Sequence, residues 1–175
     1  MSKVPEFKTA FDMLTDFIKS LDNKCTFGVD CKKNNCDIKI LNFIKDLNLQ
    51  FTNYDINYNF KCENNEYGNY HFNSSIARVF CFNYPKSFYY ILTNYKIDLF
   101  HKSDDTLYVS LSRSRYLYTT KNIQYISENY NLTKNDYKKL YCDANLSKIY
   151  NSSNNNIELD KCRIFISNKF LEFDL

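Results

Sequence analysis

The feature that most constrains this chain is its shortage of glycine, because Gly28 and Gly68 are its only glycines in 175 residues. Glycine-rich phosphate loops and dinucleotide-binding turns each need several glycines, since the backbone must approach phosphate closely and adopt positive φ angles. The chain therefore cannot form a glycine-rich phosphate loop or a dinucleotide-binding turn. Histidine is equally scarce, with only His71 and His101 present. These shortages weigh against an enzyme without excluding one, and no catalytic residue is predicted.

Length and composition predict one globular domain spanning residues 1–175. Hydrophobic residues make up 44% of the chain and charged residues 25%, which is typical of a folded protein. The formal net charge of +3 indicates no strong attraction to nucleic acids or membranes. Asn, Lys, Tyr, Phe and Ile are frequent and have AT-rich codons, which suggests an AT-rich genome such as that of a large DNA virus, a phage or a protozoan.

The cysteines and the first residues together indicate a compartment. Seven cysteines are an odd number, and the opening MSKVPEFKTAF contains neither an apolar leader nor a cleavage site. No stretch approaches the ~18 consecutive apolar residues of a membrane helix. We therefore expect reduced thiols, no membrane partner and an intracellular location, cytoplasmic or nuclear.

Residues 1–49 are predicted to form a helical N-terminal region. Apolar residues three and four positions apart predict a helix that starts near Pro5 and ends near Leu21. A second helix is predicted over 37–48, with Asp37 as its N-cap. A cysteine-containing loop joins the two helices.

Residues 50–175 are predicted to form an α+β body, so the expected fold is a compact α+β domain with a largely antiparallel sheet. Alternating apolar residues predict extended segments, and spacings of three and four predict two helices. The expected strands cover 51–60, 70–82, 107–118 and 123–126, with a hairpin over 162–175. The expected helices run from Pro85 to about Ile97 and, after a capping box at Thr133 and Asp136, to Ile149.

The segment CTFGVDCKKNNC places Cys25, Cys31 and Cys36 with the spacing C-x5-C-x4-C. Three thiolates this close could bind zinc, so these cysteines are the candidate metal ligands. The spacing resembles the first three ligands of CCCH zinc fingers, whose histidine would fall at position 40, an isoleucine here. Cys62 or His71 could complete the site instead. The alternative is that the cysteines are ordinary loop residues and the protein has no cofactor.

A longer resemblance covers residues 75–101. Pro85, Phe88, Ile91, Leu92, Tyr95 and His101 fall in register with the central helix of BTB/POZ domains of the potassium-channel tetramerisation type. The upstream SIARVF is similar to the end of an earlier helix of that family. The resemblance implies a non-catalytic module that oligomerises or adapts substrates to ubiquitin ligases.

The chain is also rich in aromatic residues, with 16 tyrosines and 15 phenylalanines. Surface tyrosines suit protein interfaces and base-stacking platforms alike. The best cluster, and the candidate binding site, consists of Tyr108, Arg113, Arg115, Tyr116 and Tyr118. We therefore expect a non-enzymatic module that binds a protein partner, with self-association open and a viral protein acting on host machinery as one form. The alternative is a single-stranded RNA-binding protein that uses aromatic stacking and a degenerate zinc loop.

Overall fold

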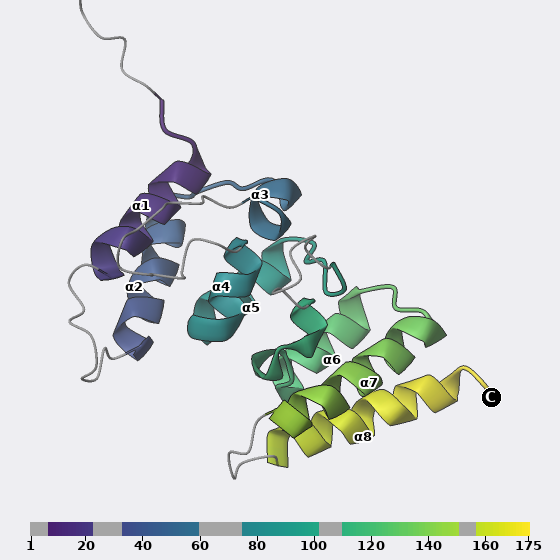
Figure 1. Ribbon diagram of the computed structural model, residues 1–175. Helices are drawn as coiled ribbons and strands as arrows, with labels where there is room; N and C mark the ends of the chain where they lie inside the picture. The colour runs from purple at the N-terminus through teal and green to yellow at the C-terminus, as the bar shows by residue number, and fades with distance from the viewer. Residues whose placement is uncertain (1–6, 23–32, 60–74, 102–109, 151–156) are drawn as a thin grey trace, which may run out of the picture. The chain divides into compact units, whose positions relative to one another are not determined.

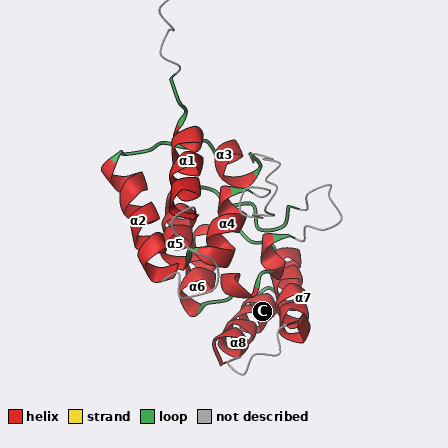
Figure 2. Cartoon of the chain, turned by 60° about the vertical axis from the view of Figure 1, so that its left-hand side comes forward, coloured by secondary structure: helices red, strands yellow, loops and turns green. Residues whose placement is uncertain are grey.

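The described part of the chain is helical (Figure 1). The computed structural model describes residues 7–22, 33–59, 75–101, 110–150 and 157–175. These residues contain α-helices, two short 3-10 helices and no strand (Figure 2). The predicted α+β fold with an antiparallel sheet is therefore wrong.

The chain divides into two compact units, Met1–Ile97 and Asp98–Leu175, and each is described by itself. The division does not fall near residue 49, where the predicted helical region ends. That residues 1–175 form one domain stays a prediction.

The first unit is built from five described helices. They are α1 (Ala10–Asp22), α2 (Lys33–Asp46), α3 (Asn53–Asn57), α4 (Ile76–Asn83) and α5 (Pro85–Asn94). Helix α2 packs against α1 and α5, and α4 packs against α3 and α5. The rings of Phe17 and Phe43 stack between α1 and α2 with centroids 4.1 Å apart. Leu14, Ile44 and Phe80 are among the fully buried core residues.

Helix α1 starts later than the sequence predicts. Residues 7–9 are not helical, and Pro5 lies outside the described residues. Thr9 instead marks the start, because its hydroxyl accepts a hydrogen bond from the backbone N–H of Asp12 at 3.1 Å. A threonine that satisfies an unpaired N–H of the first turn is a standard helix N-cap.

The predicted strand over 51–60 is wrong for its described residues, because Asn53–Asn57 form helix α3. Thr52 and Asp55 make a capping box. The Thr52 hydroxyl accepts from the Asp55 N–H at 3.0 Å, and the Asp55 carboxylate accepts from the Thr52 N–H at 3.1 Å. This local pattern outweighs the alternation of apolar residues on which the strand was predicted.

The prediction that Asp37 caps α2 is also wrong, because α2 begins four residues earlier, at Lys33. The helix ends at Asp46, and Asn48 follows it with a φ angle of 46°. The N–H of Leu49 donates to the carbonyl of Ile44 at 3.0 Å, and both side chains are buried. This is a Schellman termination, in which asparagine tolerates the left-handed conformation.

The two remaining predictions for this unit have opposite outcomes. The extended segment over 70–82 is wrong in its described part, where Ser75 caps α4 by accepting from the Arg78 N–H at 3.3 Å. The helix predicted from Pro85 is confirmed as α5, with its end at Asn94. Pro85 fits the first turn, where its missing N–H has no intrahelical partner to lose.

The described part of the second unit contains three α-helices and two short turns of 3-10 helix. They are η2 (Leu111–Arg113), η3 (Arg115–Leu117), α6 (Thr120–Asn129), α7 (Lys134–Tyr150) and α8 (Ile157–Glu172). Helix α7 packs against α8 and both 3-10 turns, and α6 packs against α8. Leu117, Ile126, Leu140 and Ile166 are fully buried in the core of this unit.

Most predictions for this unit are corrected. The helix after Thr133 is confirmed as α7, and its capping box forms, with the Thr133 N–H donating to Asp136 at 2.8 Å.

The strand over 107–118 is wrong in its described part, where η2 and η3 lie. The strand over 123–126 lies within α6, which Thr119 caps by accepting from the Asn122 N–H. The hairpin over 162–175 is wrong because residues 157–172 are one helix.

Candidate functional site

Helix α8 has apolar side chains on all its sides, although only one side packs against the rest of its unit. Leu159, Cys162 and Ile166 are buried. On the opposite side Ile157, Ile164 and Leu171 are 67%, 63% and 56% exposed. These three recur every seven residues, which places them in one row along the helix. We call this row the α8 stripe.

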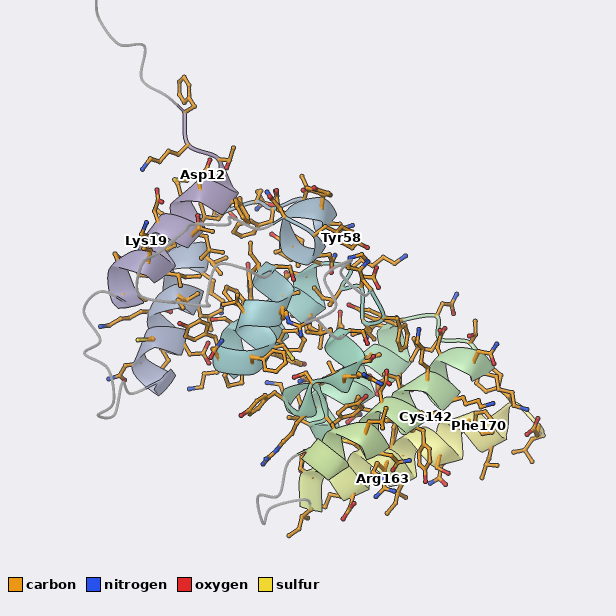
Figure 3. The ribbon with its side chains drawn as sticks, viewed as in Figure 1. Asp12, Lys19, Tyr58, Cys142, Arg163 and Phe170 are labelled. Atoms are coloured by element: carbon orange, nitrogen blue, oxygen red, sulfur yellow. The ribbon has the colours of Figure 1, made fainter. Side chains whose placement is uncertain are left out.

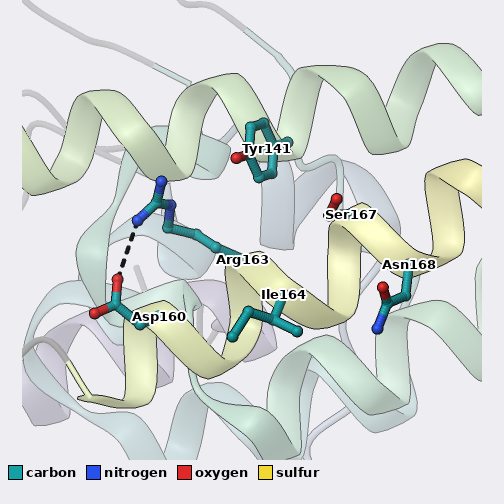
Figure 4. Close-up of a pocket in the computed structure, with 6 residues that line it drawn as sticks. All are labelled: Tyr141, Asp160, Arg163, Ile164, Ser167 and Asn168. Carbon is teal, nitrogen blue, oxygen red and sulfur yellow. Dashed lines mark hydrogen bonds and ion pairs between the residues drawn. The ribbon is translucent and has the colours of Figure 1, made fainter.

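A hollow of about 500 Å³ lies beside the α8 stripe (Figure 4). Its lining residues come from α7 and α8, and they are Tyr141, Asp160, Arg163, Ile164, Ser167 and Asn168. Ile164 belongs to both the stripe and the hollow. The stripe and the hollow therefore form one continuous surface of this unit.

Arg163 is held in place from two sides. Its Nη1 lies 3.0 Å from an Asp160 carboxylate oxygen, and its guanidinium carbon lies 5.7 Å from the centre of the Tyr141 ring. Its Nε is buried and has no hydrogen-bond partner among the described residues. Figure 4 shows the side chain extending from α8 toward α7. The guanidinium of Arg163 therefore faces α7, and Asp160 balances its positive charge.

Carboxylates flank the α8 stripe near both ends of the helix. Glu158 accepts a hydrogen bond from the Thr120 N–H at 2.6 Å, and this bond lowers the pKa of the Glu158 carboxyl below its ordinary value. Glu172 lies 3.3 Å from Lys169, and Asp174 forms an ion pair with Lys134 of α7. The stripe therefore has polar edges, and each of these carboxylates already has a donor or a cation beside it within the unit.

The candidate binding residues predicted from the sequence do not form one exposed surface in the described structure. Tyr118 is 2% exposed, and its hydroxyl donates to the backbone carbonyls of Ser112 and Leu140. Tyr116 is 54% exposed. Tyr108 lies outside the described residues. The Tyr118 ring is therefore part of the core and is not available for stacking on a base.

The two arginines of that cluster have different surroundings. Arg113 is exposed, and its Nε lies 3.6 Å from the Asp143 carboxylate. Arg115 is half-buried at the start of η3. Asp143 also accepts a hydrogen bond from the buried Ser112 hydroxyl. The contact of Arg113 thus belongs to a polar network that fastens η2 to α7.

The candidate zinc ligands lie mostly outside the described residues, since Cys25 and Cys31 fall there. Cys36 is half-buried on α2. Among the described residues, no three His, Cys, Asp or Glu side chains come close enough together to hold a metal ion. Zinc binding by the three cysteines stays a prediction.

The thiols on α7 and α8 and the described imidazole have different surroundings. Burial and the nearby negative charge of Glu158 raise the pKa of the Cys162 thiol to about 12. Cys142 is exposed on α7 (Figure 3). His101 is exposed and His71 lies outside the described residues.

The sequence interpretation missed the α8 stripe, although a signal for it was present. Ile157, Ile164 and Leu171 are seven residues apart. The neighbouring Ile164, Ile166 and Phe170 were interpreted instead as alternating strand residues. A single helix over this segment would have separated its apolar residues into a buried row and an exposed row.

Comparisons with known proteins give no family for this chain, because no protein-family model, no curated protein and no solved structure matches it. The resemblances to BTB/POZ domains and CCCH zinc fingers stay predictions. In the residues that the structure describes, every helix is too short or too polar to cross a membrane.

Proposed function

We propose that this chain is a non-enzymatic interaction module that binds a partner protein through the α8 stripe. The observation that carries the proposal is the row of exposed Ile157, Ile164 and Leu171. A helix with apolar residues on all sides is normally buried on all sides. Exposed apolar rows with polar edges are typical of protein-binding helices, whose partners cover the row.

We also propose that the module acts inside cells, in the cytoplasm or the nucleus. Cys142 and Cys162 carry free thiols, which supports a reducing compartment. If the AT-rich genome is viral, the partner belongs to host machinery. A protein interface through apolar side chains agrees with the small net charge of +3.

The test is affinity capture from an extract of the source cells with the full chain and two variants. The first variant, Ile164→Gln with Leu171→Gln, removes the apolar row while keeping good helix formers and the net charge. The matched control is Leu47→Gln, because Leu47 is 53% exposed in the first unit. We expect the wild type and the control to retain the same proteins and the double variant to lose them.

The alternative function, RNA binding, is an outcome of the same experiment. RNA bound through phosphates should be released steeply as salt rises, whereas an apolar protein interface should change little. Captured RNA that the double variant retains and that salt removes would contradict the proposal. Unchanged protein capture by the double variant would contradict it as well.

A further inference from the structure

We draw no further inference here: the strongest candidate, the α8 stripe together with the hollow beside it, carries nothing beyond the proposed function, because the carboxylates around it are already paired within the unit and nothing in the structure shows what covers it.

Discussion

At the scale of single residues, buried carboxylates connect segments that are distant in sequence. Asp37 of α2 is 1% exposed and accepts hydrogen bonds from the backbone N–H groups of Lys86 and Ser87, both at 2.8 Å. The Ser87 hydroxyl donates to the same carboxylate at 2.7 Å. Tyr84, the N-cap of α5, makes no side-chain cap itself. Asp37 therefore supplies the cap for α5 from another helix, with its charge at the positive end of the helix dipole.

Replacing Asp37 by alanine should strongly destabilise the first unit. The change leaves the part-buried N–H of Lys86, the buried N–H of Ser87 and the buried Ser87 hydroxyl without their acceptor. The expected loss is about 2–3 kcal/mol of unfolding free energy, and the melting temperature should fall by roughly 10 °C. Thermal unfolding followed by circular dichroism measures it.

The control for this variant is Asp46→Asn, at the exposed end of the same helix. It removes the same charge without a buried partner and should change the melting temperature by less than about 2 °C. If the two variants had the same melting temperature, the capping of α5 by Asp37 would not contribute to stability.

At the scale of elements, the starts of helices were readable from the sequence. Thr-x-x-Asp occurs at Thr9, Thr52 and Thr133, and each of these threonines caps a helix. The sequence interpretation used this pattern only at Thr133, where it is confirmed. The same rule applied at Thr52 would have replaced the predicted strand by helix α3, because the cap acts locally and needs no tertiary partner.

Other elements could not be predicted from local patterns. The serines at 110, 112 and 114 are all buried, and Ser112 donates to Asp143, a residue of α7 far along the chain. Nothing near residue 112 indicates this partner, so the alternation of serine with larger residues favoured a strand. The α8 stripe is an intermediate case. Its spacing is local, but only the burial of Leu159, Cys162 and Ile166 shows which side of α8 is exposed.

Glu158 of α8 joins two elements by capping α6, and this contact should depend on pH. The Thr120 N–H lowers the pKa of Glu158 in the folded chain below the ordinary value of 4.5. A lowered folded pKa adds stability that is present above pH 4.5 and is lost as the pH falls through the folded pKa. Glu158→Gln should therefore reduce stability at pH 7 by about 0.5 kcal/mol, a small effect because the carboxylate is exposed.

Melting temperatures measured from pH 7 down to pH 3 check this expectation. The difference in melting temperature between the wild type and Glu158→Gln should disappear at the acidic end, where the wild-type carboxyl is protonated. Glu128→Gln on α6 is the matched control, because its carboxylate accepts a hydrogen bond from the exposed Gln124 side chain. A gap that stayed constant over the whole range would contradict a charged cap.

At the scale of the whole molecule, the shortage of glycine and histidine shaped the functional prediction more than any motif did. It gave the expectation of a binding module, which the proposed function keeps. The candidate site moved from residues 108–118 to α8, because the Tyr118 ring that was expected to contact a ligand is buried against α7. Composition indicates which kinds of site a chain has too few residues to build. Only packing shows which side chains remain exposed.

The division at Asp98 predicts that residues 98–175 fold without the first unit. This segment has its own buried core, which includes Leu117, Ile126, Leu140 and Ile166. Domains of this size are often stable alone, although with little margin. The isolated segment should give a helical circular dichroism spectrum and a cooperative thermal transition. It should also retain the proteins that the full chain captures through the α8 stripe, because the whole stripe lies within it.

The cooperative transition needs its own control, since an exposed helical segment can also show helical circular dichroism. Ile166→Ala creates a cavity in the core of the segment and should lower the melting temperature by at least ~10 °C, whereas Ile164→Gln on the exposed side should barely change it. Equal effects of the two variants would mean that α8 is not packed in the isolated segment. A segment without any cooperative transition would show that the second unit depends on residues 1–97 for its fold.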